Sequence, residues 1–231
     1  MRTSVLAVAT LALLGRPALG EPPAGGDGGG DAVLFAEPFD AKLADGWTWL
    51  REDAGGWKIA EGALEIQAQA GTLWGQANNA KNVLLRKPPV KGVENDPFAV
   101  EATVTSAPAV TAEQAGVILY SDDDTNVKLV REHLEGKLYI VLAVEAGGSG
   151  KALAKKEVEG DTHALRLISQ GGKIRGEVKT GTPAAWTPVG SGESPFKGEM
   201  QAGLVAHGGP ADAARWAKFG EVRIVRPEVP K

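Results

Sequence analysis

Residues 126–145 read NVKLVREHLEGKLYIVLAVE, and this stretch decides the fold class. Apolar residues recur at every second position on both sides of Glu135-Gly136, a dipeptide suited to a tight turn. A period of two indicates β-strands, because neighbouring side chains of a strand point to opposite faces. The stretch therefore predicts a hairpin of two antiparallel strands, from Asn126 to Glu132 and from Leu138 to Glu145.

The alternation also predicts which side chains share a face of this hairpin. One face should carry Val127, Leu129, Arg131, Ile140, Leu142 and Val144. The other face should carry Lys128, Val130, Glu132, Tyr139, Val141, Ala143 and Glu145. Both sets contain apolar residues, as expected where a sheet packs on a partner and also forms a partly covered concave surface.

The rest of the chain from Ala32 onward repeats this pattern and shows no helical period. Gly, Asp, Asn or Pro interrupts the apolar runs about every 8–12 residues, which is typical of sandwiches and barrels. Further strands are predicted at residues 63–68, 82–86, 98–105, 115–120, 151–157, 162–169, 173–179, 201–206 and 215–225. The sequence thus predicts an all-β sandwich of two antiparallel sheets in one domain.

Turn-forming residues join several of these strands. Ser121–Asp124 should form an Asx-type turn, and Gln170–Gly172 should supply the positive φ of a short hairpin loop. Residues 107–113 are the one stretch that could form a helical turn instead.

The N-terminus has the composition of an export signal. Residues 1–20 combine a positive start, the apolar run Val5–Leu14 and small residues before Glu21. The run is too short to cross a bilayer, which needs about 20 apolar residues. We therefore predict a signal peptide over residues 1–20. The mature protein should be secreted or periplasmic, with no membrane attachment after cleavage.

Proline and glycine set the remaining boundaries. Residues 21–31 read EPPAGGDGGGD, which cannot bury apolar surface and predicts a flexible linker. The folded domain should occupy residues 32–225, and the proline-broken residues 226–231 should form a short tail.

Composition excludes several classes of site and partner. The chain has no cysteine, which rules out disulfides, thiolate zinc sites and a lipid-modified N-terminal cysteine. Lys and Arg number 25 against 29 Asp and Glu, a formal net charge of −4. This mild acidity argues against a nucleic-acid partner, which would require a basic stripe.

Short motifs in a fixed order carry a family resemblance. They are Phe35–Asp40, Leu43, Gly46-Trp47, Gly62–Ile66, Gln114–Tyr120 before the aspartate-rich turn, Ala202–Leu204 and Trp216–Phe219. In this order they resemble a concanavalin A-like jelly-roll domain. The pattern is similar to the domain C-terminal to the catalytic propeller of family 43 β-xylosidases and to stand-alone DUF1349-type domains.

The resemblance spans nearly all of residues 33–225 and implies a concanavalin A-like jelly-roll sandwich. It implies much less about function, because the superfamily includes lectins, carbohydrate-binding modules, glycanases and accessory domains. Gly220 stands where members often carry an aspartate, so the structural calcium of some relatives is not implied at this position.

Tryptophan provides the main candidates for ligand binding. Trp74 lies in the polar, glycine-flanked stretch GTLWGQANN, beside Asn78 and Asn79. A flat indole can stack on a sugar ring while amides bond its hydroxyls, but the same residue could instead be a plug over the core. Trp49 with Arg51 is a second candidate of this kind. Alternation places Trp57, Trp186 and Trp216 in the core.

The predicted concave face supplies a further set of candidate ligand-binding residues. These are Arg86, Gln114, Lys128, Glu132, Tyr139 and Glu145. Side chains of this kind on one sheet face could line a sugar-binding groove, although charges on a sheet face are usually just solvated.

No catalytic residue is predicted. A glycosidase needs two carboxylates about 5–10 Å apart. The nearest candidates, at residues 157–161 and 132–135, run directly into turns where acidic residues are simply solvated. The three histidines lack ligand spacing, and we expect no required cofactor. Asp122, Asp123 and Asp124 form a candidate calcium loop, although such a run is more often a plain turn.

Three functional hypotheses remain. The leading one is an exported, non-catalytic, lectin-like or glycan-associated module whose partner is an oligo- or polysaccharide. The first alternative is a glycoside hydrolase or lyase whose acids are hidden among turn residues. The second is a structural or protein-interaction domain of the cell envelope. The sequence does not predict the oligomeric state.

Overall fold

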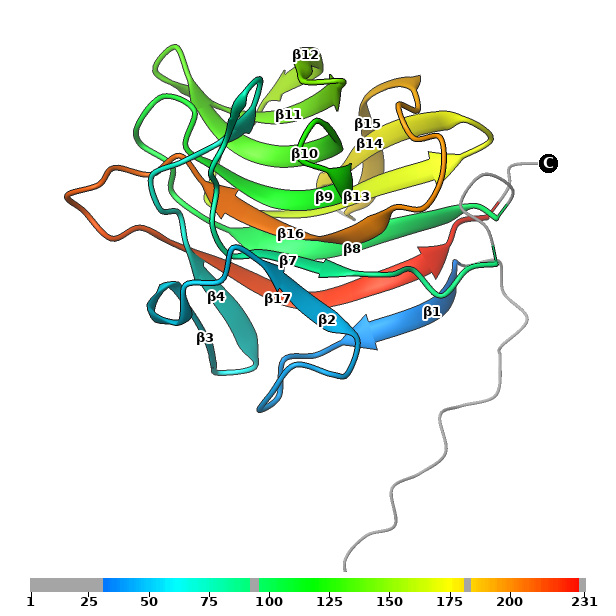
Figure 1. The fold of residues 1–231 in the computed structure, drawn as a ribbon, viewed down its shortest axis with the longest axis horizontal. Helices are drawn as coiled ribbons and strands as arrows, with labels where there is room; N and C mark the ends of the chain where they lie inside the picture. Colours follow the sequence, from blue (N-terminus) through cyan, green and yellow to red (C-terminus); the bar gives the residue numbers. More distant parts are fainter. Residues whose placement is uncertain (1–30, 92–95, 181–183, 229–231) are drawn as a thin grey trace, which may run out of the picture.

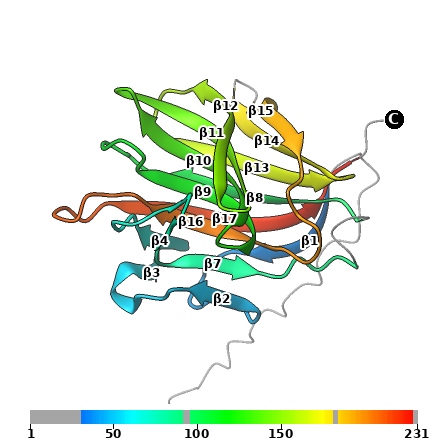
Figure 2. The same ribbon diagram turned by 45° about the horizontal axis from the view of Figure 1, so that its top comes forward.

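The computed structural model describes residues 31–91, 96–180 and 184–228, which form a two-layered β-sandwich (Figure 1). Figure 2 shows the two layers stacked face to face. The only helical element in these ranges is a 3-10 turn at Ala54–Gly56, so the all-β class is confirmed. No helix among the described residues is long and apolar enough to span a membrane. The predicted signal peptide lies outside the described residues.

The first sheet has eight strands. They are β1 (Ala32–Glu37), β3 (Trp57–Ala60), β4 (Ala63–Gln67), β8 (Phe98–Thr105), β13 (Thr162–Gln170), β14 (Lys173–Thr180), β15 (Ala185–Glu193) and β17 (Trp216–Arg226). Their spatial order is β15-β14-β13-β8-β17-β4-β3, with β1 also paired to β17. All the pairings are antiparallel.

The second sheet has seven strands. They are β2 (Trp47–Leu50), β7 (Val83–Arg86), β9 (Gln114–Asp122), β10 (Thr125–Leu134), β11 (Lys137–Ala146), β12 (Ser149–Glu157) and β16 (Gln201–His207). Their order is β12-β11-β10-β9-β16-β7-β2. A separate small hairpin joins β5 (Leu73–Trp74) to β6 (Ala77–Asn78).

The core lies between the two sheets, on the face that the alternation assigns to it. Leu129 and Leu142 are fully buried there, against residues of the first sheet. Val130 and Val141 point the other way and belong to a second apolar cluster on the outer face. Burying a large apolar side chain contributes about 1.5–3 kcal/mol, so both clusters stabilise the sheet. The predicted assignment of faces in residues 126–145 is confirmed.

The predicted turns are also present. Glu135 and Gly136 both have positive φ, and Gly171 and Gly172 do as well. Asp122 Oδ1 accepts a hydrogen bond from the Asp124 amide at 2.9 Å, which is the expected Asx-type turn. Residues 107–113 form irregular backbone with a bend and a turn, and no helix is present there.

Four longer strands were not predicted: β1, β2, β3 and β15. Strand β15 contains Pro188 and two glycines, a composition that argues against a strand. The sheet tolerates this composition because β15 is an edge strand and its pairing register with β14 shifts beside Pro188. A Cβ at Gly190 would lie 2.4 Å from the Cβ of Ala154, so this glycine lets β15 approach β12 of the other sheet. The glycine in β15 is therefore explained by packing against β12 and not by local sequence preference.

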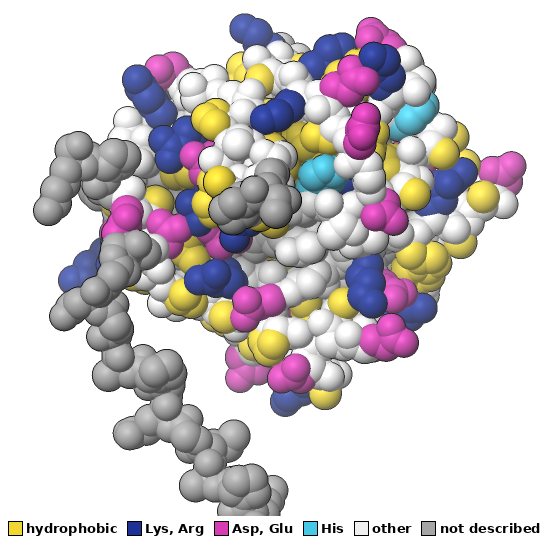
Figure 3. Space-filling model, turned by 180° about the vertical axis from the view of Figure 1, so that it is seen from behind, with side chains coloured by type: hydrophobic (Ala, Val, Ile, Leu, Met, Phe, Trp, Pro, Cys, Tyr) yellow, Lys and Arg dark blue, Asp and Glu magenta, His cyan; other side chains and the backbone are white. Residues whose placement is uncertain are grey.

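The outer face of the eight-stranded sheet carries paired charges. Glu177, Arg166, Glu101 and Arg223 are directly opposite one another on four adjacent strands and alternate in sign. Seen from behind, the surface of the molecule shows basic and acidic side chains interspersed (Figure 3). Cross-strand pairs of opposite charge stabilise a sheet.

Candidate functional site

Five of the predicted groove residues lie on the outer face of the seven-stranded sheet. Gln114 of β9 and Tyr139 of β11 both pair with Glu132 of β10. Lys128 lies further along β10, and Glu145 lies at the far end of β11. The predicted grouping of these five on one face is therefore correct.

This face is covered by residues 68–82, here called the cover segment, which cross the strands in Figure 1. Leu73 is fully buried in the outer apolar cluster. Its carbonyl accepts a 2.8 Å hydrogen bond from Nζ of Lys128, which fixes the segment to β10. At one end of the crossing, Gln69 forms a bridge with His207 of β16.

The cover segment changes the environment of the predicted groove. The prediction that these side chains line an open groove is wrong, because each is at most 9% exposed. The five are Gln114, Lys128, Glu132, Tyr139 and Glu145. They form a buried polar layer under a loop, so a bound ligand would meet the segment before it met the sheet.

Lys128 is the central charge of this layer. It is 1% exposed, and no carboxylate of the described residues lies within 4.0 Å of its ammonium. Burial lowers the pKa of Lys128 to about 8, while the more distant Glu132 and Glu145 oppose the shift. Nε2 of His207 lies 3.5 Å from Nζ. Burial and the charge of Lys128 both lower the pKa of His207, so its imidazole is neutral.

The two ends of the polar layer differ in how well their polar groups are satisfied. At one end, Nε2 of Gln114 donates to Glu132 at 2.8 Å. At the other, neither oxygen of the Glu145 carboxylate accepts a hydrogen bond from the described residues. Burial raises the pKa of Glu145, although Lys128, the Gly75 N–H and the Asn126 amide lie close enough to oppose the rise.

Trp74 lies on top of the polar layer and is 42% exposed. Its indole packs against the backbone of Gly150 in β12, where an added Cβ would lie 2.7 Å from Cε2. Nζ of Lys128 lies 5.8 Å from the ring centroid. Leu73 is therefore the fully buried plug of this segment, and Trp74 leaves part of its indole open to solvent.

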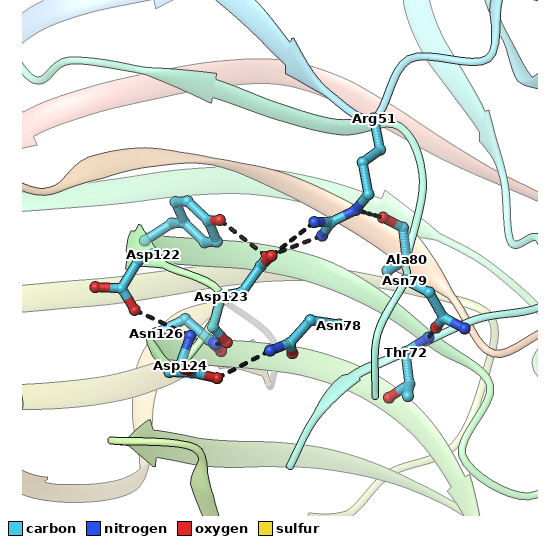
Figure 4. Close-up of polar contacts among 10 residues, drawn as sticks. Arg51, Thr72, Asn78, Asn79, Ala80, Asp122, Asp123, Asp124 and Asn126 are labelled. Carbon is cyan, nitrogen blue, oxygen red and sulfur yellow. Dashed lines mark hydrogen bonds and ion pairs between the residues drawn. The ribbon is translucent and has the colours of Figure 1, made fainter. Parts of the chain in front are cut away.

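The aspartate turn holds the cover segment in place (Figure 4). Arg51 donates to both oxygens of Asp123, at 2.8 and 3.0 Å, and to the Ala80 carbonyl at 2.6 Å. Burial would raise the pKa of Asp123, but the bonds from Arg51 and Tyr120 outweigh it and lower the pKa. Nδ2 of Asn78 donates to Asp124 at 2.9 Å.

These contacts give structural tasks to three predicted ligand-binding residues. Arg51 and Asn78 bond to the aspartate turn. Oδ1 of Asn79 accepts a bond from the Thr72 amide at 2.9 Å, within the cover segment itself (Figure 4). Among the described residues, no group of three or more His, Cys, Asp or Glu side chains is placed to hold a metal ion.

Two predicted site residues lie elsewhere. The guanidinium of Arg86 stacks 3.5 Å from the centroid of Phe35 and donates to the Asp45 carbonyl. Arg86 therefore lies on the opposite face of β7 from the polar layer, because its neighbour Leu85 occupies the outer side. Trp49 packs against the inner core with Trp57, their ring centroids 4.8 Å apart.

Two tryptophans predicted as core are not buried. Trp216 is 36% exposed and borders a cavity of about 200 Å³ at the end of the sandwich. Trp186 is half-buried on the outer face of the eight-stranded sheet, with Arg166 over its ring at 4.3 Å. Alternation gives the face of a strand but not which face is covered, which explains both errors.

The carboxylates of the polar layer are too far apart to act together in glycoside hydrolysis. Glu145 pairs with Asn126, which lies on the same strand as Glu132. At about 3.4 Å per residue, the two carboxylates are held roughly 20 Å apart along the sheet. Two of the turn acids are solvated, as expected: Glu157 pairs with Lys137 and Glu135 with Lys155, all four exposed. The expectation is wrong for Glu132, which is only 7% exposed and belongs to the polar layer.

Sequence reasoning missed His207 and Asn126 as members of this site. His207 was set aside for lack of ligand spacing, yet alternation within Gln201–His207 places it on the face of Gly203 and Val205. Asn126 was assigned to its strand without a role. Pairing it with Glu145 across the Glu135-Gly136 turn could have found it.

Known structures with the same fold include bacterial GH43 proteins. A GH43 protein of Bacillus licheniformis superposes with a TM-score of 0.72 at 20% identity, covering 83% of this chain and 39% of that one. A xylan beta-1,4-xylosidase of Bacillus halodurans gives a TM-score of 0.69 at 18% identity, covering 90% and 41%. The chain thus spans about two fifths of the length of these proteins.

A shorter protein also matches. A functionally unknown protein of Saccharomyces cerevisiae gives a TM-score of 0.61 at 17% identity, covering 79% of this chain and 97% of that one. At these identities the structures establish the fold alone. No curated protein matches the chain. Residues 36–224 match the family described as the beta-xylosidase C-terminal concanavalin A-like domain, and the chain therefore belongs to that family.

Proposed function

We propose that this chain is a non-catalytic, glycan-binding module with its site at the exposed indole of Trp74. The observation that carries the proposal is that a large apolar ring packs closely against Gly150 yet remains 42% exposed. Aromatic rings pre-positioned in this way stack on sugar rings with little loss of conformational entropy. Membership of a family named for the C-terminal concanavalin A-like domain of a beta-xylosidase supports the same conclusion.

Exposed amides around the ring supply the polar half of such a site. Gln76 and Asn79 are both exposed and lie within five residues of Trp74. Their amides can bond sugar hydroxyls beside the indole. Gln114 and Glu145 are buried beneath the cover segment, so we assign them to supporting it. The partner is an oligo- or polysaccharide, and the export signal over residues 1–20 would bring the protein to it outside the cytoplasm.

A glycan array tests the proposal. The purified chain is screened with calcium and again with a chelator, alongside Trp74→Ala and a matched control, Trp216→Ala. Trp216 has similar exposure but lies in β17 of the eight-stranded sheet, beside Ala68 at the start of the cover segment and not at the hairpin that carries Trp74. We expect a specific hit that Trp74→Ala abolishes and Trp216→Ala retains.

Gly150→Val sharpens the test. The new side chain would displace the indole without removing it, because even a Cβ lies within 2.7 Å of the ring. Loss of the same hit in Gly150→Val would show that the position of the ring matters. A broad panel with no hit, or a hit that survives Trp74→Ala, would overturn the proposal.

A further inference from the structure

Unpartnered oxygen acceptors gather at the Glu145 end of the polar layer. Both carboxylate oxygens of Glu145, Oδ1 of Asn126 and Oδ1 of Asn78 are buried atoms that accept no hydrogen bond of good geometry from the described residues, although the Gly75 N–H and the Asn126 amide lie near the Glu145 carboxylate. Glu145 and Asn126 are each 1% exposed. Buried polar atoms are rarely left unsatisfied, and an unpartnered charge is the most costly case.

The three side chains come from three neighbouring segments. Glu145 and Asn126 are direct cross-strand partners on β11 and β10, so their Cβ atoms are about 5 Å apart. Asn78 belongs to the β5–β6 hairpin, which lies over this end of the sheet. It bonds to Asp124, in the turn that leads into Asn126 (Figure 4). The N–H of Gly75, in the same hairpin, is close to Glu145.

The orientation of both amides is fixed by other contacts. Nδ2 of Asn78 donates to Asp124 at 2.9 Å, and Nδ2 of Asn126 donates to the Asp123 carbonyl at 3.1 Å. Flipping either amide would exchange a satisfied donor for a clash between two acceptors. The amide oxygens therefore remain acceptors.

Neighbouring cations are engaged elsewhere. The ammonium of Lys128 donates to the Leu73 carbonyl, and it lies beyond 4.0 Å from every described carboxylate. The guanidinium of Arg51 is held by Asp123 and Ala80. The four acceptor oxygens of Glu145, Asn126 and Asn78 therefore have no positively charged partner, and a cation that binds oxygen ligands would supply one.

We propose that Glu145, Asn126 and Asn78 bind a hard divalent cation of the size of Ca²⁺. A carboxylate that can bind through both oxygens and two amide oxygens are ligands that Ca²⁺ takes, with water completing the shell. The cation joins β10 and β11 to the hairpin that carries Trp74. With one carboxylate in the set and Lys128 nearby, affinity is weak, with a dissociation constant on the order of 10⁻⁴–10⁻³ M.

The site is distinct from two other candidate calcium positions. Asp123, in the aspartate turn, already bonds Arg51 and Tyr120 through its carboxylate. Gly220 lies in β17 of the other sheet. Cation binding at this site does not depend on glycan binding, since a cation can fix the hairpin whether or not Trp74 binds a sugar.

Thermal unfolding with and without Ca²⁺ tests the site. The full chain is compared in chelator and in about 10 mM Ca²⁺, together with Glu145→Gln and a control, Glu132→Gln. Glu132 is a buried carboxylate on the same face, but Gln114 already bonds it. Ca²⁺ should raise the unfolding temperature of wild type and Glu132→Gln by about 3–10 °C and leave Glu145→Gln unchanged.

A second variant and a second readout keep the test decisive if Glu145→Gln is poorly folded. Asn126→Asp adds a carboxylate to the ligand set and should tighten Ca²⁺ binding by about tenfold. Tb³⁺ luminescence excited through tryptophan should appear on titration, and Ca²⁺ should compete it away. Equal Ca²⁺ shifts in wild type and Glu145→Gln would overturn the proposal, as would no shift in wild type together with no gain in Asn126→Asp.

Discussion

The outer faces of the two sheets each contain one largely buried cation. One of these cations is paired with carboxylates, and the other is not. On the eight-stranded sheet, Arg166 lies directly between Glu101 and Glu177 of the adjacent strands and bonds to Glu101 at 2.6 Å. On the seven-stranded sheet, the strand neighbours of Lys128 are Ile118 and Ala143, and its ammonium bonds to a backbone carbonyl.

The difference follows from what covers each face. On the open face, opposite charges pair across strands and the ladder continues to solvent. On the covered face, the cover segment shields the ammonium of Lys128 from water. In return, the ammonium donates one hydrogen bond to a backbone carbonyl of that segment. A lone buried charge costs more free energy than a paired one, because no opposite charge compensates for the water that it loses.

Breaking the paired face should have the strongest effect on stability. Arg166→Met leaves Glu101 and Glu177 buried without their shared cation, which should lower the free energy of unfolding by about 3–5 kcal/mol. Urea denaturation measures the loss. Arg175→Met is the control, because Arg175 is the more exposed partner of Glu177 and should cost about 1 kcal/mol or less. Equal losses of unfolding free energy in the two variants would contradict a special role of Arg166 in the row of paired charges.

Uncovering the other face should cost less. Leu73→Ala removes the plug of the cover segment and should lower the free energy of unfolding by about 2–3 kcal/mol. Amide hydrogen exchange in residues 69–82 should speed up before exchange in β10 does. Trp74→Ala is the control: with its ring 42% exposed, it should leave stability within about 1 kcal/mol. A larger loss for Trp74→Ala would make Trp74 the plug.

The weakest effect concerns the lone charge itself and depends on pH. The folded pKa of Lys128 is about 8, below its ordinary value of 10.5, so the unfolded chain binds more protons between these two pH values. Stability contributed by this site therefore rises with pH through that window, and below it the cost of burying the charge is fully present.

Lys128→Met should remove this dependence. The difference in unfolding free energy between wild type and the variant should shift in favour of wild type by on the order of 2 kcal/mol from about pH 7.5 to about pH 10.5. Urea denaturation at both pH values, compared between the two proteins, measures the shift. Parallel pH profiles would mean that the ammonium is better solvated than its burial indicates.

Most strands of the seven-stranded sheet and the two faces of the β10–β11 hairpin were predictable, since they depend on local alternation. Residues 126–145 carried that information directly, and Lys128, Glu132 and Glu145 were placed on the correct face. Arg86 was misplaced because its strand is short and flanked by lysine and prolines, so a shift of one residue reverses the assignment. Strand β15 was missed because its glycines are explained only by the facing strand β12.

Family and fold class were both contained in the order and spacing of side chains along the chain. The sequence pattern did not show whether a polar residue on a strand faces water or a covering loop, because that depends on contacts between residues distant in sequence. Leu73 and Lys128 are 55 residues apart, and their single hydrogen bond places the cover segment over the sheet. Local pattern fixes the direction in which a side chain points, whereas burial is decided by the segment that arrives there on folding.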